Sequence, residues 1–160
     1  VLNEVLQKLP EKEKSTSTYL NYLSVKKRNG EYLSWSSSGT QKQYSLINFW
    51  ASWDKESIAI KDSLYALCEK FSKNNFRVVN FSLDYNKEEW GKNTQKDTEQ
   101  WIEVCDYKGW NNQILKQQNI QRLPYNILID QNRKILGSNL YGNALQTKME
   151  ALIAEDKQQK

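Results

Sequence analysis

The chain has 160 residues, of which 38% are hydrophobic, and its 23 basic and 19 acidic residues give a net charge of +4. This length fits one domain with a single core, and no apolar stretch is long enough to predict a transmembrane helix. The sequence has no histidine and two cysteines, which excludes Ser/His and Cys/His catalytic pairs and a Cys/His zinc site, so we expect no metal and no other cofactor.

The first residues carry apolar side chains at helical spacing, from Leu2 to Leu9. Pro10 and the polar residues after it end this pattern. We predict a short amphipathic lead-in helix and a linker over residues 1–18.

Residues 18–25 and 30–37 flank an Asn29-Gly30 turn signal and together predict a hairpin. The densest basic run, Lys26-Lys27-Arg28, comes just before this turn and is typical of a solvated turn and not of a phosphate site. The other basic residues are scattered among acidic and amide residues, so we expect no nucleic-acid partner.

The rest of the chain alternates between strand and helix patterns. The apolar run YSLINFWA, residues 44–51, predicts a central strand that is covered on both faces, and apolar residues from Ile60 to Phe71 form one face of a long helix. Then follow the strand FRVVNFSLD, the helix KEEWGKNTQK, the extended piece WIEVCD, the helix WNNQILKQQNI, the hairpin YNILID and KILGSNL, and the helix ALQTKMEALIAE. This order predicts a three-layer α/β/α sandwich with a mixed central sheet. The expected organisation is a lead-in over 1–18, one domain over 19–156 and a polar tail over 157–160.

Two separated motifs resemble those of thioredoxins. LINFWASWDKES, residues 46–57, resembles the turn that presents the reactive C-x-x-C, and RLPYNILID, residues 122–130, resembles the loop in which a cis-proline enters the next strand. The stretches SLDYNKEEWGK and WIEVCDYKGW are similar to an insertion in thiol-disulfide oxidoreductases of the cytochrome-maturation type, especially Bacteroidetes-like members. The resemblance spans residues 19–155. It implies a thioredoxin-like α/β fold with an N-terminal hairpin and an extracytoplasmic location, periplasmic or tethered to the envelope, in which any membrane contact is made through a tether outside this chain.

Asp54 and Ser57 stand where the resemblance places the two cysteines. Aspartate is a preferred helix N-cap, which accounts for Asp54, and neither a carboxylate nor a hydroxyl can carry out disulfide exchange. Asp54 and Glu56 are not expected to act as an acid–base pair, because residues two apart on a helix point to different faces. We therefore predict a degenerate, redox-inactive site without catalytic residues. Arg133 is a further departure, in a turn where the family usually has glycine.

The two cysteines lie in apolar contexts. Cys68 falls on the apolar face of the predicted helix, where a small buried side chain is expected. Cys105 precedes Asp106, whose charge disfavours a thiolate. We expect the two cysteines to be unpaired. The alternative function is that of a thiol-disulfide oxidoreductase, a protein of cell redox homeostasis, that acts through Cys105 or through a partner domain outside this chain.

The part of the family site that remains is a binding surface. The predicted groove residues are Trp50, Trp53, Asp54, Lys55, Glu56, Ser57, Leu123 and Pro124. In the family the residue before the cis-proline pairs its backbone with an extended peptide, so Leu123 is predicted to bind an extended peptide or protein partner by strand addition. The alternative is that the tryptophans only pack in the core or at its rim and that the cis bond only shapes a turn.

Overall fold

The computed structural model describes residues 18–35, 42–94 and 97–158. The predicted lead-in helix lies outside these residues. The elements are β1 (Tyr44–Trp50), α3 (Lys55–Phe71), the 3-10 turn η1 (Ser72–Asn74), β2 (Phe76–Ser82), α4 (Lys87–Lys92), β3 (Trp101–Cys105), the 3-10 turn η2 (Gly109–Asn111), α5 (Gln113–Gln117), β4 (Tyr125–Ile129), β5 (Ile135–Ser138) and α6 (Gly142–Gln158).

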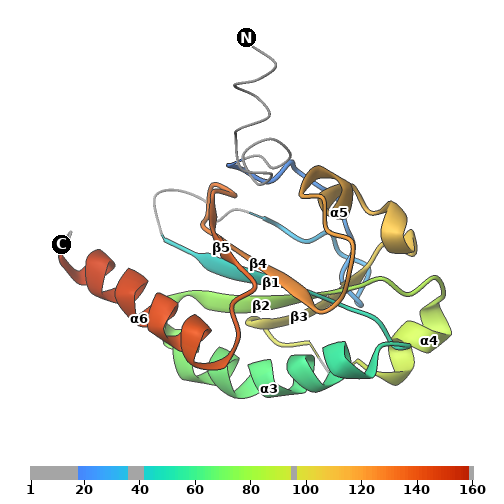
Figure 1. The fold of residues 1–160 in the computed structure, drawn as a ribbon, viewed down its shortest axis with the longest axis horizontal. Helices are drawn as coiled ribbons and strands as arrows, with labels where there is room; N and C mark the ends of the chain where they lie inside the picture. Colours follow the sequence, from blue (N-terminus) through green and yellow to red (C-terminus); the bar gives the residue numbers. More distant parts are fainter. Residues whose placement is uncertain (1–17, 36–41, 95–96, 159–160) are drawn as a thin grey trace, which may run out of the picture.

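The strands form one five-stranded sheet in the order β3-β2-β1-β4-β5 (Figure 1). β1 is parallel to β2 and β2 is parallel to β3, whereas β4 runs antiparallel to both β1 and β5. Every residue of β1 and β2 is buried, as expected for inner strands that are covered on both faces. The predicted central strand and mixed sheet are confirmed.

Two apolar cores lie on opposite faces of the sheet. Helices α3 and α6 pack on one face, where Leu64, Leu145 and Met149 join side chains of the strands (Figure 1). The other face is covered by α5 and by the irregular segment 18–35, which contributes Leu20, Leu23, Val25, Leu33 and Trp35. The predicted three-layer α/β/α arrangement is therefore confirmed, although one outer layer consists largely of irregular chain.

The predicted N-terminal hairpin is present in a short form, in which residues 25–27 pair with residues 31–33. Gly30 has a φ of +88°, which glycine adopts without a steric penalty. Next to it, Lys26 and Tyr32 form an isolated antiparallel bridge, and the Leu33 N–H donates to the Val25 carbonyl at 2.8 Å. The predicted hairpin is therefore confirmed, but its arms are shorter than the sequence pattern indicated, because no regular strand is assigned over residues 18–35.

The reason is the path of this segment across the sheet. Tyr19 bridges to Lys134, just before β5 at one edge, and Lys27 bridges to Val104 of β3 at the other edge. The segment therefore crosses the sheet face and uses its backbone groups at separate points along the way. It covers the core and pairs with itself only close to the turn at Gly30.

The C-terminal boundary differs from the sequence pattern. α6 continues to Gln158, so residues 157 and 158 of the predicted polar tail are helical. The turn before β5 contains Arg133, where the family usually has glycine. Arg133 adopts a left-handed φ of +64°, a conformation that glycine takes without a steric penalty. Its Nε donates to the Leu20 carbonyl at 3.1 Å, and its guanidinium lies 5.6 Å from the Tyr22 ring centroid. Among the described helices, none has the length and hydropathy needed to cross a membrane.

Candidate functional site

The two positions where the resemblance places cysteines lie at the N-terminus of helix α3. Asp54 is its N-cap, with extended backbone angles, and its Oδ2 accepts a hydrogen bond from the Ser57 N–H at 3.1 Å. The Ser57 hydroxyl donates to the Asp54 carbonyl at 2.9 Å and accepts from the Ala51 N–H at 3.2 Å. Ser57 is 1% exposed, so its hydroxyl serves the turn and is closed to a ligand. The predicted N-cap role of Asp54 is confirmed.

The tryptophans on either side of this turn differ completely in exposure. Trp53 is 52% exposed and stacks on Tyr85, with ring centroids 5.9 Å apart and an interplanar angle of 13°. Trp50 is fully buried beneath α3. The inclusion of Trp50 in the groove is therefore wrong, because the last residue of a central strand is covered on both faces.

Asp84 anchors the turn from below. This carboxylate is 1% exposed and accepts from the Ser52 N–H at 3.1 Å and from the Ser82 hydroxyl at 2.6 Å. It thereby fixes the chain between β1 and α3 against the end of β2. The exposed Trp53–Tyr85 pair sits on this rigid support, since Tyr85 follows Asp84 directly.

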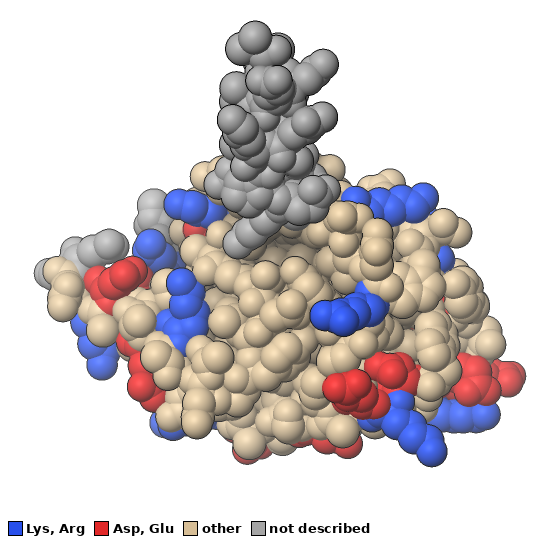
Figure 2. All heavy atoms as spheres, viewed as in Figure 1, with Lys and Arg blue, Asp and Glu red and all other residues tan. Residues whose placement is uncertain are grey.

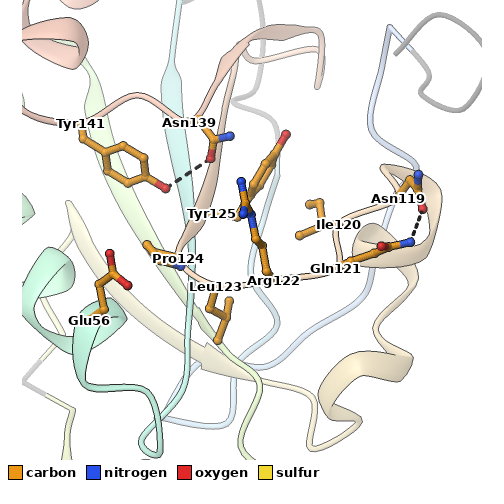
Figure 3. A pocket seen from close by; sticks show the side chains of 10 residues that line it. All are labelled: Glu56, Asn119, Ile120, Gln121, Arg122, Leu123, Pro124, Tyr125, Asn139 and Tyr141. Carbon is orange, nitrogen blue, oxygen red and sulfur yellow. Dashed lines mark hydrogen bonds between the residues drawn. The ribbon is translucent and has the colours of Figure 1, made fainter. Parts of the chain in front are cut away.

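A groove of about 880 Å³ lies between the start of α3 and the loop that enters β4 (Figure 3). Three predicted residues line it: Glu56, Leu123 and Pro124. The Leu123–Pro124 peptide bond is cis. The other lining residues are Asn119, Ile120, Gln121, Arg122, Tyr125, Asn139 and Tyr141. The other predicted residues of the turn do not line the groove. Trp53 and Asp54 lie in the turn before α3, Lys55 is the first residue of the helix, and Ser57 is buried.

The loop before Pro124 presents unpaired backbone. In the described part of the chain, residues 121–123 neither donate nor accept a backbone hydrogen bond. Pairing with β1 begins only at Tyr125, opposite Phe49. An extended segment laid beside this loop would therefore find free N–H and C=O groups.

Tyr141 and Asn139 form the wall opposite the loop. The Tyr141 hydroxyl donates to Asn139 Oδ1 at 3.3 Å. Burial, together with Tyr125 and the carboxylate of Glu56, raises the pKa of Tyr141 to about 12. This phenol therefore stays neutral and offers a hydrogen bond and an apolar ring.

The fold has counterparts in known proteins. The family model described as thioredoxin-like matches residues 42–135. The chain belongs to the thioredoxin-like family. No curated protein matches it. It is 37% identical to a thiol-disulfide oxidoreductase from Bacteroides fragilis NCTC 9343, over 84% of this chain and 98% of that one, with a TM-score of 0.72.

Two further solved structures show the same arrangement. The C-terminal domain of a proposed thiol-disulfide oxidoreductase from Bacteroides thetaiotaomicron is 33% identical, covers 88% of this chain and 97% of its own, and has a TM-score of 0.75. The thioredoxin domain of a thiol-disulfide oxidoreductase from Bacteroides vulgatus, at 21% identity, shares the fold over 86% of this chain and 97% of its own, with a TM-score of 0.72. The predicted family and thioredoxin-like fold are confirmed.

Both thiols of this thioredoxin-like chain lie in the interior. Cys68 and Cys105 are free, and each thiol donates to a carbonyl, that of Gln100 at 3.1 Å and that of Asp84 at 3.3 Å. Burial raises the pKa of each thiol to about 11. They belong to different core clusters, so the prediction that they are unpaired is confirmed.

Neither thiol should react in the native protein. At about pH 8 a thiol with a pKa of about 11 is ionised in only about one molecule in a thousand, and burial also denies a reagent access. Titration with a chromogenic disulfide should give a negligible fast phase before unfolding and two thiols per chain after it. If one thiol per chain reacts in the fast phase, and this reaction is lost in Cys105→Ser, the result would contradict this prediction and favour the oxidoreductase alternative.

A buried ion pair lies behind the turn and was not found from the sequence. Lys61 Nζ is 2.7 Å from Glu103 Oε1, and the side chains are 2% and 0% exposed. The same Nζ donates to the Asn93 carbonyl at 2.8 Å and lies 3.8 Å from the Trp50 ring centroid. Burial raises the pKa of Glu103 to about 7 and lowers that of Lys61, while each charge opposes the shift of the other. The signals in the sequence were one charge on the apolar face of α3, Lys61, and one charge of opposite sign in the buried strand β3, Glu103.

The outer surface carries charges of both signs. On the face shown in Figure 2, acidic and basic side chains are interspersed and leave a broad uncharged area between them. In the described residues, no group of three or more His, Cys, Asp and Glu is arranged to hold a metal ion.

Proposed function

We propose that this thioredoxin-like domain is a redox-inactive module that binds an extended peptide segment of a protein partner along residues 121–123. The observation that carries the proposal is the free backbone of this loop, which borders a groove next to the start of α3. Extended peptides add to such an edge through main-chain hydrogen bonds, and their alternate side chains enter neighbouring pockets. Leu123 supplies the pairing backbone next to Pro124.

The substituted turn supports the redox-inactive part of the proposal. Asp54 and Ser57 are committed to capping α3, and neither can form or receive a disulfide. Trp53 supports the binding part, because a half-exposed tryptophan on a rigid support is typical of residues that dominate binding energy. The resemblance to the cytochrome-maturation type is the basis for proposing an extracytoplasmic location.

The wild-type chain should reduce insulin no faster than dithiothreitol alone. Exchange requires a thiolate to attack and a second thiol to resolve the mixed disulfide, and both remaining thiols are buried. Turbidity of the insulin B chain measures the rate. Acceleration that depends on Cys105 would replace this proposal with the oxidoreductase alternative.

A peptide selected from a random twelve-residue display library on the wild-type domain should bind through its backbone at Leu123. N-methylation of the residue that pairs with Leu123 removes a donor, and Trp53→Ala removes the exposed ring, so each should raise Kd about tenfold or more. Fluorescence anisotropy gives Kd, and NMR amide shifts map the site.

The matched control is Tyr32→Ala, a 62% exposed aromatic residue at the turn beside the β3 edge, which should leave Kd unchanged. Failure to select any peptide, or amide shifts confined to residues away from 121–125, would remove the proposed function. If Trp53→Ala and Tyr32→Ala raise Kd equally, the peptide binds exposed aromatic rings nonspecifically.

A further inference from the structure

The groove contains one residue of each charge. Glu56, in the first turn of α3, is its single acid, and Arg122, two residues before Pro124, is its single base. The other eight lining residues are uncharged. The groove therefore has a defined electrostatic polarity in addition to its shape.

These two charges come from different elements and lie apart. Figure 3 shows the Glu56 carboxylate on one side of Pro124 and the Arg122 guanidinium on the other. Both side chains are exposed, and in the described part of the chain neither makes an ion pair or a side-chain hydrogen bond. They are thus free to meet charges of an occupant.

The floor between the two charges is suited to an extended chain. Pro124 provides apolar surface there, the Tyr125 and Tyr141 rings add to it from the sides, and residues 121–123 provide free backbone groups. In an extended peptide, side chains that are two residues apart point to the same side, so one strand can present two separate charges to the groove.

We propose that the groove selects an extended peptide of opposite polarity, with a basic side chain beside Glu56 and an acidic side chain or carboxylate beside Arg122. This inference rests on the proposed function and names the class of peptide that the same site takes. Both charges lie at an exposed rim, where such pairs set orientation and partner choice more than they set affinity. The order of the two charges along the peptide reports its direction across Leu123.

The test uses peptides selected on the wild-type domain and their charge-swapped versions, in which the acidic and basic residues are exchanged. Wild type should select peptides that carry one residue of each sign, and exchanging them should weaken binding about three- to tenfold. The variant Glu56→Lys/Arg122→Glu has the same net charge and should reverse this preference. Added salt should reduce the difference between the two peptides.

The matched control is Glu88→Lys/Lys87→Glu, an equal exchange of two exposed residues of α4 outside the groove, which should retain the wild-type preference. Peptides that bind at 121–125 with no charge pattern, or a preference that the groove variant does not reverse, would overturn the polarity but leave the proposed function standing. A domain that selects no peptide would overturn both. Circular dichroism of each variant verifies that the fold is intact.

Discussion

Replacing Lys61 with methionine should lower the free energy of unfolding by about 3–5 kcal/mol at about pH 8. Methionine fills nearly the same length but leaves the Glu103 carboxylate, 0% exposed, without its partner. An unpaired charge in this position costs far more than the lost contact, because its desolvation is no longer offset. Urea denaturation, with circular dichroism as the readout, measures the change.

Lys92→Met is the matched control. Lys92 also pairs with a glutamate, Glu89 at 3.0 Å, but the two side chains are 65% and 49% exposed. Its loss should change stability by about 0.5 kcal/mol or less. Adding Glu103→Leu to Lys61→Met should recover most of the lost stability, because no charge then stays buried. Equal effects from Lys61→Met and Lys92→Met would contradict the burial of the pair.

The destabilisation caused by Lys61→Met should grow as pH rises. Burial raises the pKa of Glu103 from 4.5 to about 7, so the folded protein keeps this proton after the unfolded chain has lost it. The contribution of this group to stability is therefore full below about pH 4.5 and is lost as pH rises through about 7. Without Lys61, its attraction no longer lowers the pKa of Glu103, so this pKa rises further. The decrease in stability then continues to higher pH than in the wild type. A destabilisation that is larger at pH 5 than at pH 8 would contradict this sign.

The sequence predicted those features that depend on local pattern. The continuous apolar run of β1 and the helical spacing of the apolar residues of α3 are each visible in one short window. The N-cap role of Asp54 is equally local. The N-terminal hairpin is shorter than its sequence pattern indicated, because the segment also uses backbone groups against Lys134 and Val104, which lie far away in the sequence.

Features that need two distant segments were not predicted. Lys61 lies on a helix and Glu103 on a strand, and only the packed fold brings them to 2.7 Å. The same is true of the groove, where Tyr141 from the chain after β5 faces Pro124 from the loop before β4. Trp50 was misplaced because a tryptophan next to a family motif has the same appearance in sequence whether it is exposed or buried.

Introducing cysteines at Asp54 and Ser57 should turn this domain into a catalyst of insulin reduction, with a rate about tenfold or more above the uncatalysed reaction. A thiol at the N-cap of α3 faces unpaired N–H groups and the positive end of the helix dipole, which lower its pKa and favour the thiolate. Residue 57 lies one turn further along and is 1% exposed, so its thiol is placed to resolve and not to attack.

The exchange requires both new sulfurs and the groove beside them. The thiol introduced at position 54 attacks an insulin disulfide and releases one insulin thiol, and the thiol at position 57 then displaces the second, leaving a protein disulfide that dithiothreitol reduces. Asp54→Cys alone should therefore stay near the uncatalysed rate. The matched pair Asn86→Cys/Glu89→Cys starts α4 with the same cap geometry, since Asn86 Oδ1 accepts from the Glu89 N–H at 2.8 Å. The Asn86→Cys/Glu89→Cys variant lacks the Leu123 backbone next to its thiols and should therefore reduce insulin more slowly. If mass spectrometry finds both cysteines of the Asp54→Cys/Ser57→Cys variant free after mild oxidation of a folded protein, these two residues do not occupy the family's thiol positions.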